Sequence, residues 1–357
     1  NEELGDKLGI GISLNNIGNV HANKGDYDKA LDYYERSLKI DEELGDKYGI
    51  GASLNNIGIV YWNKGDYEKA LDYFKRSLTI LEELGNKSGM GYNLNNIGLV
   101  YWNKGDYEKA LDYYERSLAI AEELGDKRGM GGILSNIGNV HKDQGDYDKA
   151  LDYYIRSLKI NEEIDDKNGM GWSLNNIGNI YAVKGDYDKS LDYHTHSLKT
   201  YNDINAKFGM MFCLFDIGRD VYTNTGDYNN ALDYITRSLD ICKEFGNKHM
   251  MGWIFKSIGC VYHNKGDLDT ALDYYGRSLA ISEEVGDTSG IGESLGNIGV
   301  LYYWKGEQDK ALDIYTRIIK IFDELGDNHS KGIILNNIGL VYWKIGDFDK
   351  ALDYYNC

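Results

Sequence analysis

Cysteine and histidine are the first residues to consider for chemistry, because thiolates and imidazoles bind metals and act as nucleophiles or bases. The four cysteines form no short-range pair and no metal-binding spacing. We interpret Cys213, Cys242, Cys260 and Cys357 as reduced thiols and expect three of the four to be buried. His194 and His196 lie two residues apart, so on a helix their side chains would diverge by about 200°. The sequence therefore predicts no metal site and no cofactor.

Two other patterns look like a nucleotide-binding loop and a catalytic carboxylate pair, but neither has the features that such a site requires. The glycine pair of Gly9-Ile10-Gly11 recurs along the chain, yet no strand precedes it and the third glycine of a nucleotide-binding loop is missing. We interpret these glycines as points of close approach between successive helical hairpins. The carboxylates of Asp41, Glu42 and Glu43 are typical of a solvated helix face. No Ser-His-Asp or Cys-His set can be assembled, so we predict that the chain is not an enzyme and has no catalytic residue.

Asparagine and tryptophan offer a different chemistry, which is non-covalent binding. Asparagine amides can donate to and accept from the main chain of an extended peptide whatever its sequence. They recur at a fixed position, often in pairs: Asn15-Asn16 with Asn19, Asn55-Asn56, Asn95-Asn96, Asn175-Asn176 and Asn336-Asn337, with Asn136 and Asn297 alone. The six tryptophans are Trp62, Trp102, Trp172, Trp253, Trp304 and Trp343. Exposed tryptophan often marks a binding surface.

An internal repeat must position these side chains. Gly-Asp-Tyr begins at Gly25, Gly65, Gly105, Gly145 and Gly185, which is a period of 40 residues, and it continues in variant form to Gly346. Asn-Ile-Gly runs in step from Gly18 to Gly339. These markers define nine repeats over residues 1–357, of which the sixth has 41 residues.

Each repeat predicts two amphipathic helices, which we call A and B. In the first repeat, apolar residues at helical spacing predict helix A over about 8–23 and helix B over about 27–44. Gly25 and Gly45 suit left-handed helix ends, and Asp26 and Asp46 suit the N-caps that follow. A Gly-Asp pair at both turns accounts for the absence of proline.

Gly18 lies in the middle of helix A, where glycine costs about 1 kcal/mol relative to alanine. Its recurrence implies that helix B comes too close for a side chain. Ala30 and Ser37 offer a matching small surface, and Tyr34 fills the volume beside it. The asparagines lie on the opposite side of helix A, and every tryptophan lies on an A helix, at offsets that place it on the asparagine side.

These residues carry the signature of tetratricopeptide repeats, which the chain resembles throughout: Leu54, Ile57, Gly58, Tyr61, Ala70, Phe74 and Ser77 match the pattern in the second repeat. The missing proline and the 40-residue period resemble the long-helix subtype of kinesin light chains and LGN/Pins adaptors. The phrase Glu-Glu-Leu-Gly-Asp-Lys is also similar to arrays in prokaryotic signalling proteins. The resemblance implies an all-α fold, a right-handed superhelical solenoid of about nine helix-turn-helix repeats, with A helices lining the concave surface.

The resemblance also suggests a binding mode, because the asparagines are similar to the ladder in the O-GlcNAc transferase repeats, which holds substrate main chain. The first asparagine of each pair either contacts a ligand or bonds to the neighbouring repeat, and for the second we favour a structural bond. The tryptophans either bind a partner or pack between A helices. We therefore expect a peptide-binding groove that includes Asn15, Asn19, Asn55, Trp62, Asn95, Trp102, Trp172, Asn175, Trp253, Trp304, Asn336 and Trp343.

Repeat six departs from the pattern. Met210 to Asp216 replaces the usual small and amide residues, and the extra residue falls near Asp220. We expect either a π-bulge or a longer turn there. Phe212 and Phe215 either form a pocket for an apolar anchor or reflect drift of the repeat.

The formal net charge of −18 disfavours nucleic acid and anionic membranes as partners. It suggests a protein or extended peptide, for which a basic or polar segment is the natural complement. No apolar run is long enough to span a membrane, and Asn1 to Leu4 is not a secretory signal, so we expect a cytoplasmic protein. Partial helices at both ends suggest a segment of a larger protein.

Three functions follow as hypotheses. The first is a non-catalytic scaffold that binds a protein or peptide in the groove. The second is a regulatory or sensor arm of a multidomain signalling protein. The third is an array that self-associates end to end, and the alternative to it is a monomer.

Overall fold

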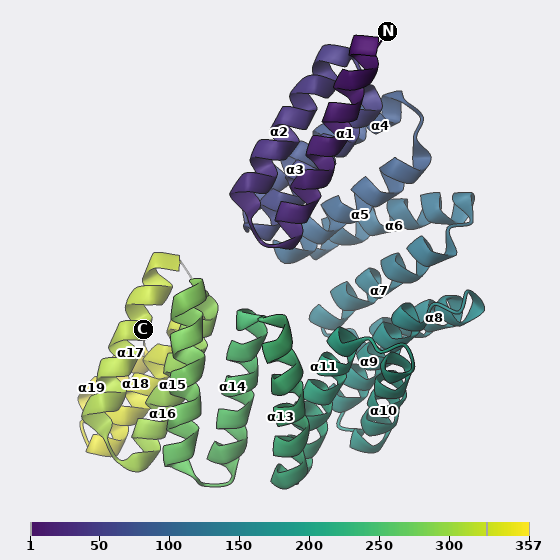
Figure 1. Ribbon diagram of the computed structural model, residues 1–357. Coiled ribbons are helices and arrows are strands. Elements are labelled where there is room, and N and C mark those ends of the chain that lie inside the picture. The colour runs from purple at the N-terminus through teal and green to yellow at the C-terminus, as the bar shows by residue number, and fades with distance from the viewer. Residues whose placement is uncertain (1, 326–327, 357) are drawn as a thin grey trace. The chain divides into compact units, whose positions relative to one another are not determined.

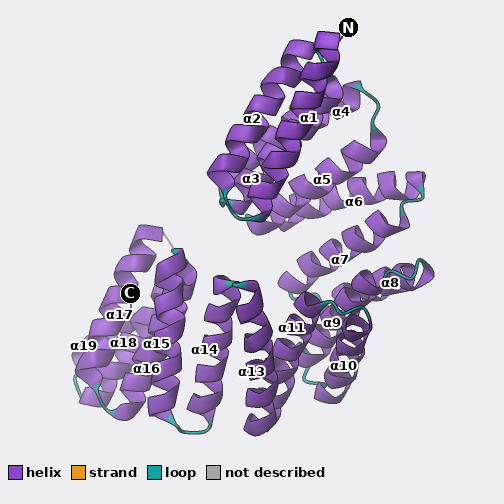
Figure 2. Cartoon of the chain, viewed as in Figure 1, coloured by secondary structure: helices purple, strands orange, loops and turns teal. Residues whose placement is uncertain are grey.

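The computed structural model describes residues 2–325 and 328–356, with side chains over 7–323 and 330–356. These residues form helices and no strand (Figures 1 and 2). The A helices of the nine repeats are α1 (Glu2–Asn23), α3 (Lys47–Asn63), α5 (Lys87–Asn103), α7 (Lys127–Asp143), α9 (Lys167–Val183), α11 (Lys207–Asp216) with η1 (Ile217–Tyr222) and α12 (Thr223–Thr225), α14 (Lys248–Asn264), α16 (Thr288–Lys305) and α18 (Asn328–Ile345). The B helices are α2 (Tyr27–Leu44), α4 (Tyr67–Glu83), α6 (Tyr107–Leu124), α8 (Tyr147–Glu163), α10 (Tyr187–Asp203), α13 (Tyr228–Phe245), α15 (Leu268–Val285), α17 (Gln308–Leu325) and α19 (Phe348–Tyr355). The predicted all-α repeat fold is confirmed.

The Gly-Asp turns form as predicted. Gly25 has φ 78° and Gly45 has φ 68°, a left-handed conformation that glycine adopts without steric cost. Asp66 then caps α4, because its carboxylate accepts from the Lys69 backbone N–H at 3.2 Å. Asp165 and Asn205 replace the glycine at two turns with φ of 51° and 52°, and these are residue types that tolerate this conformation.

The first helix differs from its prediction. We expected a separate partial helix at the start of the chain and helix A to begin near Leu8, but α1 runs without a break from Glu2 to Asn23. Gly5 and Asp6 are helical there, whereas Gly45 and Asp46 end one helix and begin the next. Glycine permits both conformations, so the local sequence does not choose between them.

Mid-helix glycines do mark close contact between helices A and B. A Cβ on Gly58 would lie 2.7 Å from the Phe74 ring, and a Cβ on Gly18 would lie 2.6 Å from the Tyr34 ring. The aromatic ring therefore packs directly on the glycine rather than beside it. Ser37 is more than a small residue, because its buried hydroxyl donates to the Gly11 carbonyl at 2.8 Å.

The paired glycines at the start of the A helices face two different neighbours. The first glycine approaches the preceding repeat, as expected: a Cβ on Gly49 would lie 2.6 Å from the Asp41 carboxylate. The second glycine faces helix B of its own repeat, since a Cβ on Gly91 would lie 3.3 Å from Ile120. The expectation of contact between successive hairpins is thus correct for Gly49 and wrong for Gly91.

The chain divides into two compact units, residues 1–180 and 181–357. In the first unit, buried apolar residues of α3 to α7 form the core, with the Phe74 and Tyr114 rings fully buried. In the second, α11 to α18 contribute a core around Ile235, Ile258 and Tyr315. Continuity of one solenoid across residues 1–357, and its right-handed superhelix, stay predictions.

Repeat six contains a π-bulge, which is one of the two alternatives expected for its extra residue. Residues Ile217–Tyr222 form a π-helix, η1, between α11 and α12. The extra residue is therefore accommodated within helix A and not in the turn after it. No helix among the described residues is both long and apolar enough to cross a membrane.

Candidate peptide-binding surface of the A helices

The predicted asparagine row exists in the first unit, and its members bond to one another. Asn56 Nδ2 donates to Asn15 Oδ1 at 2.8 Å, and Asn96 Nδ2 donates to Asn55 Oδ1 at 3.1 Å. Asn136 Nδ2 donates to Asn95 Oδ1 at 3.0 Å. The first asparagine of one repeat thus accepts from the second asparagine of the next, 41 residues later. Both members of a pair therefore bond to a neighbouring repeat, the first through its side-chain oxygen and the second through one amide N–H. These contacts fit the structural alternative.

The row stops where its residue types change. Ser135 stands where Asn95 stands one repeat earlier, and it bonds Ser157 at 2.9 Å. The amide nitrogen of Asn176 has no partner among the described side chains. Asn175 is buried, which contradicts its expected position at an open surface. In the second unit Gly296 replaces the first asparagine, and Asn336 is exposed.

Asn19 has a different structural role from the paired asparagines. Its Oδ1 accepts from the Tyr34 hydroxyl at 2.7 Å, and Asn139 accepts from Tyr154 at the same distance. Asn19 is exposed, whereas Asn139 is buried. This position therefore bonds the A helix to the B helix of its own repeat.

The six tryptophans fall into two groups. Trp62 and Trp102 are half-buried against the core of the first unit, and the Trp102 indole donates to Asp143 of the next repeat at 2.8 Å. These two fit the packing alternative. The other four have between 43 and 62% of their surface exposed, and they are Trp172, Trp253, Trp304 and Trp343.

Large apolar side chains recur at one exposed position of helix A, three residues before the first asparagine. We call this the apolar row, and its members are Ile12, Ala52, Tyr92, Gly132, Trp172, Phe212, Trp253, Glu293 and Ile333. Ile12, Tyr92, Trp172, Trp253 and Ile333 are all exposed. Sequence reasoning found the tryptophans of this row but missed Ile12, Tyr92 and Ile333, although the same 40-residue period marks them.

The phenylalanines of repeat six do not share one environment. Phe215 is 2% exposed in the core of the second unit, with the Arg219 guanidinium 4.8 Å from its ring centre, so its expected role at an open groove is wrong. It occupies the first-asparagine position, and a large apolar ring there gains free energy from burial. Phe212 is half-buried and lies edge-on to Phe208 at 5.1 Å.

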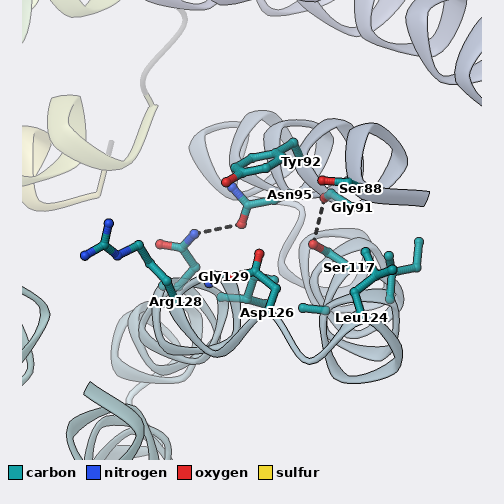
Figure 3. Close-up of a pocket in the computed structure, with 14 residues that line it drawn as sticks. Ser88, Gly91, Tyr92, Asn95, Ser117, Leu124, Asp126, Arg128 and Gly129 are labelled. Carbon is teal, nitrogen blue, oxygen red and sulfur yellow. Dashed lines mark hydrogen bonds between the residues drawn. The ribbon is translucent and has the colours of Figure 1, made fainter. Parts of the chain in front are cut away.

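A hollow of about 230 Å³ opens between α5, α6 and α7 in the first unit. Its floor is apolar, and the Asn95–Asn136 hydrogen bond runs along one side (Figure 3). Tyr92 lies beside Asn95, while the Arg128 side chain extends away from the other labelled residues. Its lining residues are Ser88, Gly91, Tyr92, Asn95, Ser117, Ile120, Ala121, Leu124, Asp126, Arg128, Gly129, Gly132, Ile133 and Asn136.

Negative charge is concentrated on the B helices. By the bounds given above, the B helices hold 35 of the 57 acidic residues, whereas the A helices from α3 to α18 hold four. Each of the four has a partner: Asp143 bonds Trp102, Asp216 and Asp220 bond Arg219, and Glu293 bonds Lys256. The charge that suggested a basic partner therefore lies mainly away from the A-helix side chains.

The cysteines and histidines that the structure describes differ in burial. Cys213 and Cys242 are buried and Cys260 is partly exposed, so two of the three expected buried thiols are found, and Cys357 lies outside the described residues. His194 is buried and His196 exposed, as their divergence on the helix requires. Among the described side chains, no three His, Cys, Asp or Glu residues gather closely enough to hold a metal ion.

Comparison with known structures gives the same fold at low sequence identity. BtubC (BKLC) from P. vanneervenii is 20% identical with a TM-score of 0.54, over 62% of this chain and 92% of that one. A Rap protein complexed with Competence and Sporulation Factor is 15% identical with a TM-score of 0.63, over 91% of this chain and 99% of that one.

A signal transduction ATPase with numerous domains and a tetratricopeptide repeat sensor, PH0952 from Pyrococcus horikoshii, is 15% identical with a TM-score of 0.64. The match covers 92% of this chain and 51% of that protein, so this chain spans about half of its length. A search of curated protein sequences found no significant match. The kinesin light chain subtype stays a prediction.

Family profiles agree with the repeat found in the sequence. A tetratricopeptide repeat profile matches residues 9–83, 129–203, 220–284 and 290–357, and a second tetratricopeptide repeat profile matches residues 93–124. These matches cover most of the chain. The chain belongs to the tetratricopeptide repeat family.

Proposed function

We propose that this chain is a non-catalytic scaffold that binds an extended peptide or protein segment on the side chains of its A helices. The observation that carries the proposal is the apolar row. A solvated helix position normally holds a polar residue, yet five of its nine members are large, apolar and exposed. Repeated exposure of this kind marks a surface that a partner covers.

The asparagine row supports a peptide as the ligand. After the inter-repeat bonds are made, each bonded pair still has amide groups that can hydrogen-bond to a main chain. The Rap protein of similar fold has a factor bound, which gives a precedent for ligand binding by this architecture. The low acidic content of the A helices removes the reason to expect a basic ligand at this surface.

The test compares tryptophans of the apolar row with an exposed apolar residue on a B helix. Trp172→Ala and Trp253→Ala each remove a half-exposed ring, and Ile155→Ala on α8 is the matched control. Peptides selected from a random displayed library against the unaltered chain are the probes. We expect at least one tryptophan variant to bind them about tenfold more weakly and the control to bind normally. Equal affinity for all four proteins would contradict the proposal.

A regulatory arm is the second candidate, and it is favoured by the repeat sensor of the ATPase that shares this fold. In that case the same A-helix surface would sense a ligand for an attached domain. Reading the complete gene that encodes this chain tests it. A catalytic or nucleotide-binding domain in the same reading frame is the expected result, and flanking sequence that encodes only further repeats would count against it.

End-to-end association is the third candidate. Exposed apolar side chains on α1, including Ile10, Ile17 and Val20, could pack on another copy. Light scattering over a concentration series should then show mass rising with concentration. A constant monomer mass would exclude it.

A further inference from the structure

We propose that the hollow between α5, α6 and α7 holds one uncharged apolar side chain of the bound peptide, of leucine or phenylalanine size. The inference rests on the proposed function and names the part of the ligand that anchors it. Four properties of the hollow support it: its origin, its polar edge, its charge and its size.

The hollow exists because two positions that carry large side chains in other repeats carry small residues here. Ala121 is buried in its floor, where Leu81 and Tyr201 place larger side chains in other repeats. At the mouth, Gly132 has no side chain, where Trp172 and Tyr92 place rings in their own repeats. A Cβ on Gly132 would have nothing within 4 Å. The space is therefore open to a side chain from another molecule.

One edge of the hollow can bind the ligand's main chain. Asn136 donates to Asn95, which leaves the amide N–H groups of Asn95 and the Oδ1 of Asn136 available. Together they offer donors and an acceptor, which is the set that the C=O and N–H of an extended peptide require. Ser117 cannot serve in this way, because its hydroxyl is buried and donates to the Gly91 carbonyl at 2.8 Å (Figure 3).

The charged groups that line the hollow already have polar partners. Asp126 and Arg128 are its charged lining residues. Asp126 caps α7 by accepting from the Gly129 backbone N–H at 2.9 Å, and Arg128 pairs with Asp166 at 3.0 Å. The floor of Ile120, Ala121, Leu124 and Ile133 is aliphatic, and placing a charge on such a floor would cost free energy without a partner.

The volume sets the size of the ligand group. Pockets that enclose a drug-sized molecule measure about 300 to 1,000 Å³, and this hollow measures about 230 Å³. It suits one large side chain better than a whole small molecule. Tyr92, which lines the hollow and is 65% exposed, has ring surface left for contact with an inserted side chain.

The experiment uses the full chain and blocked heptapeptides of sequence acetyl-Ser-Gly-Ser-X-Ser-Gly-Ser-amide. X is Phe, Leu, Ala, Asp or Lys, and affinity is measured by NMR titration. We expect the Phe or Leu peptide to bind about tenfold or more tightly than the Ala peptide, because burial of such a side chain contributes that much. The Asp and Lys peptides should bind no better than the Ala peptide.

Two variants locate the effect. Gly132→Tyr should close the mouth of the hollow and abolish the preference for Phe or Leu. Gly276→Tyr, the same change in open space on α15, should leave the preference intact. Ala121→Leu introduces the residue type that Leu81 has at the equivalent position of the second repeat. It should fill the floor of the hollow and likewise abolish the preference for Phe or Leu. Thermal melting by circular dichroism establishes that each variant is folded.

Equal binding of the Phe, Leu and Ala peptides by the unaltered chain would overturn this inference, as would a preference that survives in Gly132→Tyr or Ala121→Leu. The proposed function is judged separately by the library-selected peptides and Trp172→Ala. If Trp172→Ala weakens the binding of those peptides while the heptapeptides show no preference, the inference about the hollow is wrong and the proposed scaffold function stands.

Discussion

The Tyr34 hydroxyl donates a 2.7 Å hydrogen bond to Oδ1 of Asn19, fifteen residues earlier in the same repeat. The ring of Tyr34 meanwhile covers Gly18. The fourth repeat has the equivalent hydrogen bond, which Tyr154 donates to Asn139. In repeat two both partners are apolar, because Phe74 replaces the tyrosine and Ile59 the asparagine. In each of these repeats the two positions match in polarity, as burial requires.

Repeat three breaks this match, and the mismatch predicts opposite effects of one substitution. Leu99 takes the acceptor's place, and the buried Tyr114 hydroxyl has no partner among the described residues. Tyr114→Phe should leave the free energy of unfolding unchanged or raise it by about 1 kcal/mol. Tyr154→Phe should lower it by about 1 to 3 kcal/mol, because Asn139 loses its donor. Urea unfolding checks both, and a larger loss for Tyr114→Phe would refute the argument.

Alanine should also act in opposite directions at two mid-helix glycines. Gly58→Ala places a Cβ 2.7 Å from the Phe74 ring, and overpacking of this kind costs about 1 to 3 kcal/mol. Gly132→Ala meets open space and should stabilise by about 0.5 to 1 kcal/mol through helix propensity. Thermal unfolding of the two variants against the unaltered chain measures the difference. Stabilisation by Gly58→Ala would show that the ring moves aside freely.

Asp41 should make stability depend on pH in the acid range. It is buried between repeats, and burial raises the pKa of its carboxyl above the ordinary 3.8, although the Ser53 hydroxyl donates to it at 3.1 Å. The folded state then binds a proton more tightly than the unfolded state does. Its contribution to the free energy of unfolding is therefore largest below pH 3.8 and falls as pH rises through the raised pKa.

Asp41→Asn should remove this dependence and stabilise the protein at neutral pH. Asn161 occupies the equivalent position in repeat four and donates to Ser157 and Ser173, both at 3.3 Å, so the amide fits. Urea midpoints from pH 3 to 8 measure the effect. Asp112→Asn on the surface of α6 is the control, since exposed ion pairs contribute little. A loss of stability at pH 7 in Asp41→Asn would mean that the carboxylate is favourable as it stands.

The cysteines should differ in reactivity towards iodoacetamide. Burial raises the pKa of the Cys213 thiol to about 12 and also raises the pKa of Cys242, so neither forms the reactive thiolate readily. Cys260 is partly exposed and should be labelled at least tenfold faster in the folded protein. Peptide mass spectrometry resolves the sites, and labelling in urea shows their equal reactivity once unfolded. Comparable rates for Cys213 and Cys260 before unfolding would disprove the assignment.

The sequence alone determined the helical repeats, their turns and the close contact at Gly18. These features depend on residues near one another along the chain. Gly25 and Asp26 set a turn by their own conformational preferences, and a 3.6-residue period sets the buried face of each helix. The extra residue of repeat six predicted either a π-bulge or a longer turn, and the structure decided between them with the π-helix Ile217–Tyr222.

Only the tertiary structure decided which amides meet and which aromatic rings are open. Asn95 bonds a residue 41 positions away, and the spacing between repeats that permits this depends on every side chain in the interface. Phe215 is buried and Trp253 exposed, although both were expected on the same surface. The hollow beside Gly132 depends on three helices at once. A helical period gives the direction of a side chain, but the packing of neighbouring repeats decides whether anything covers it.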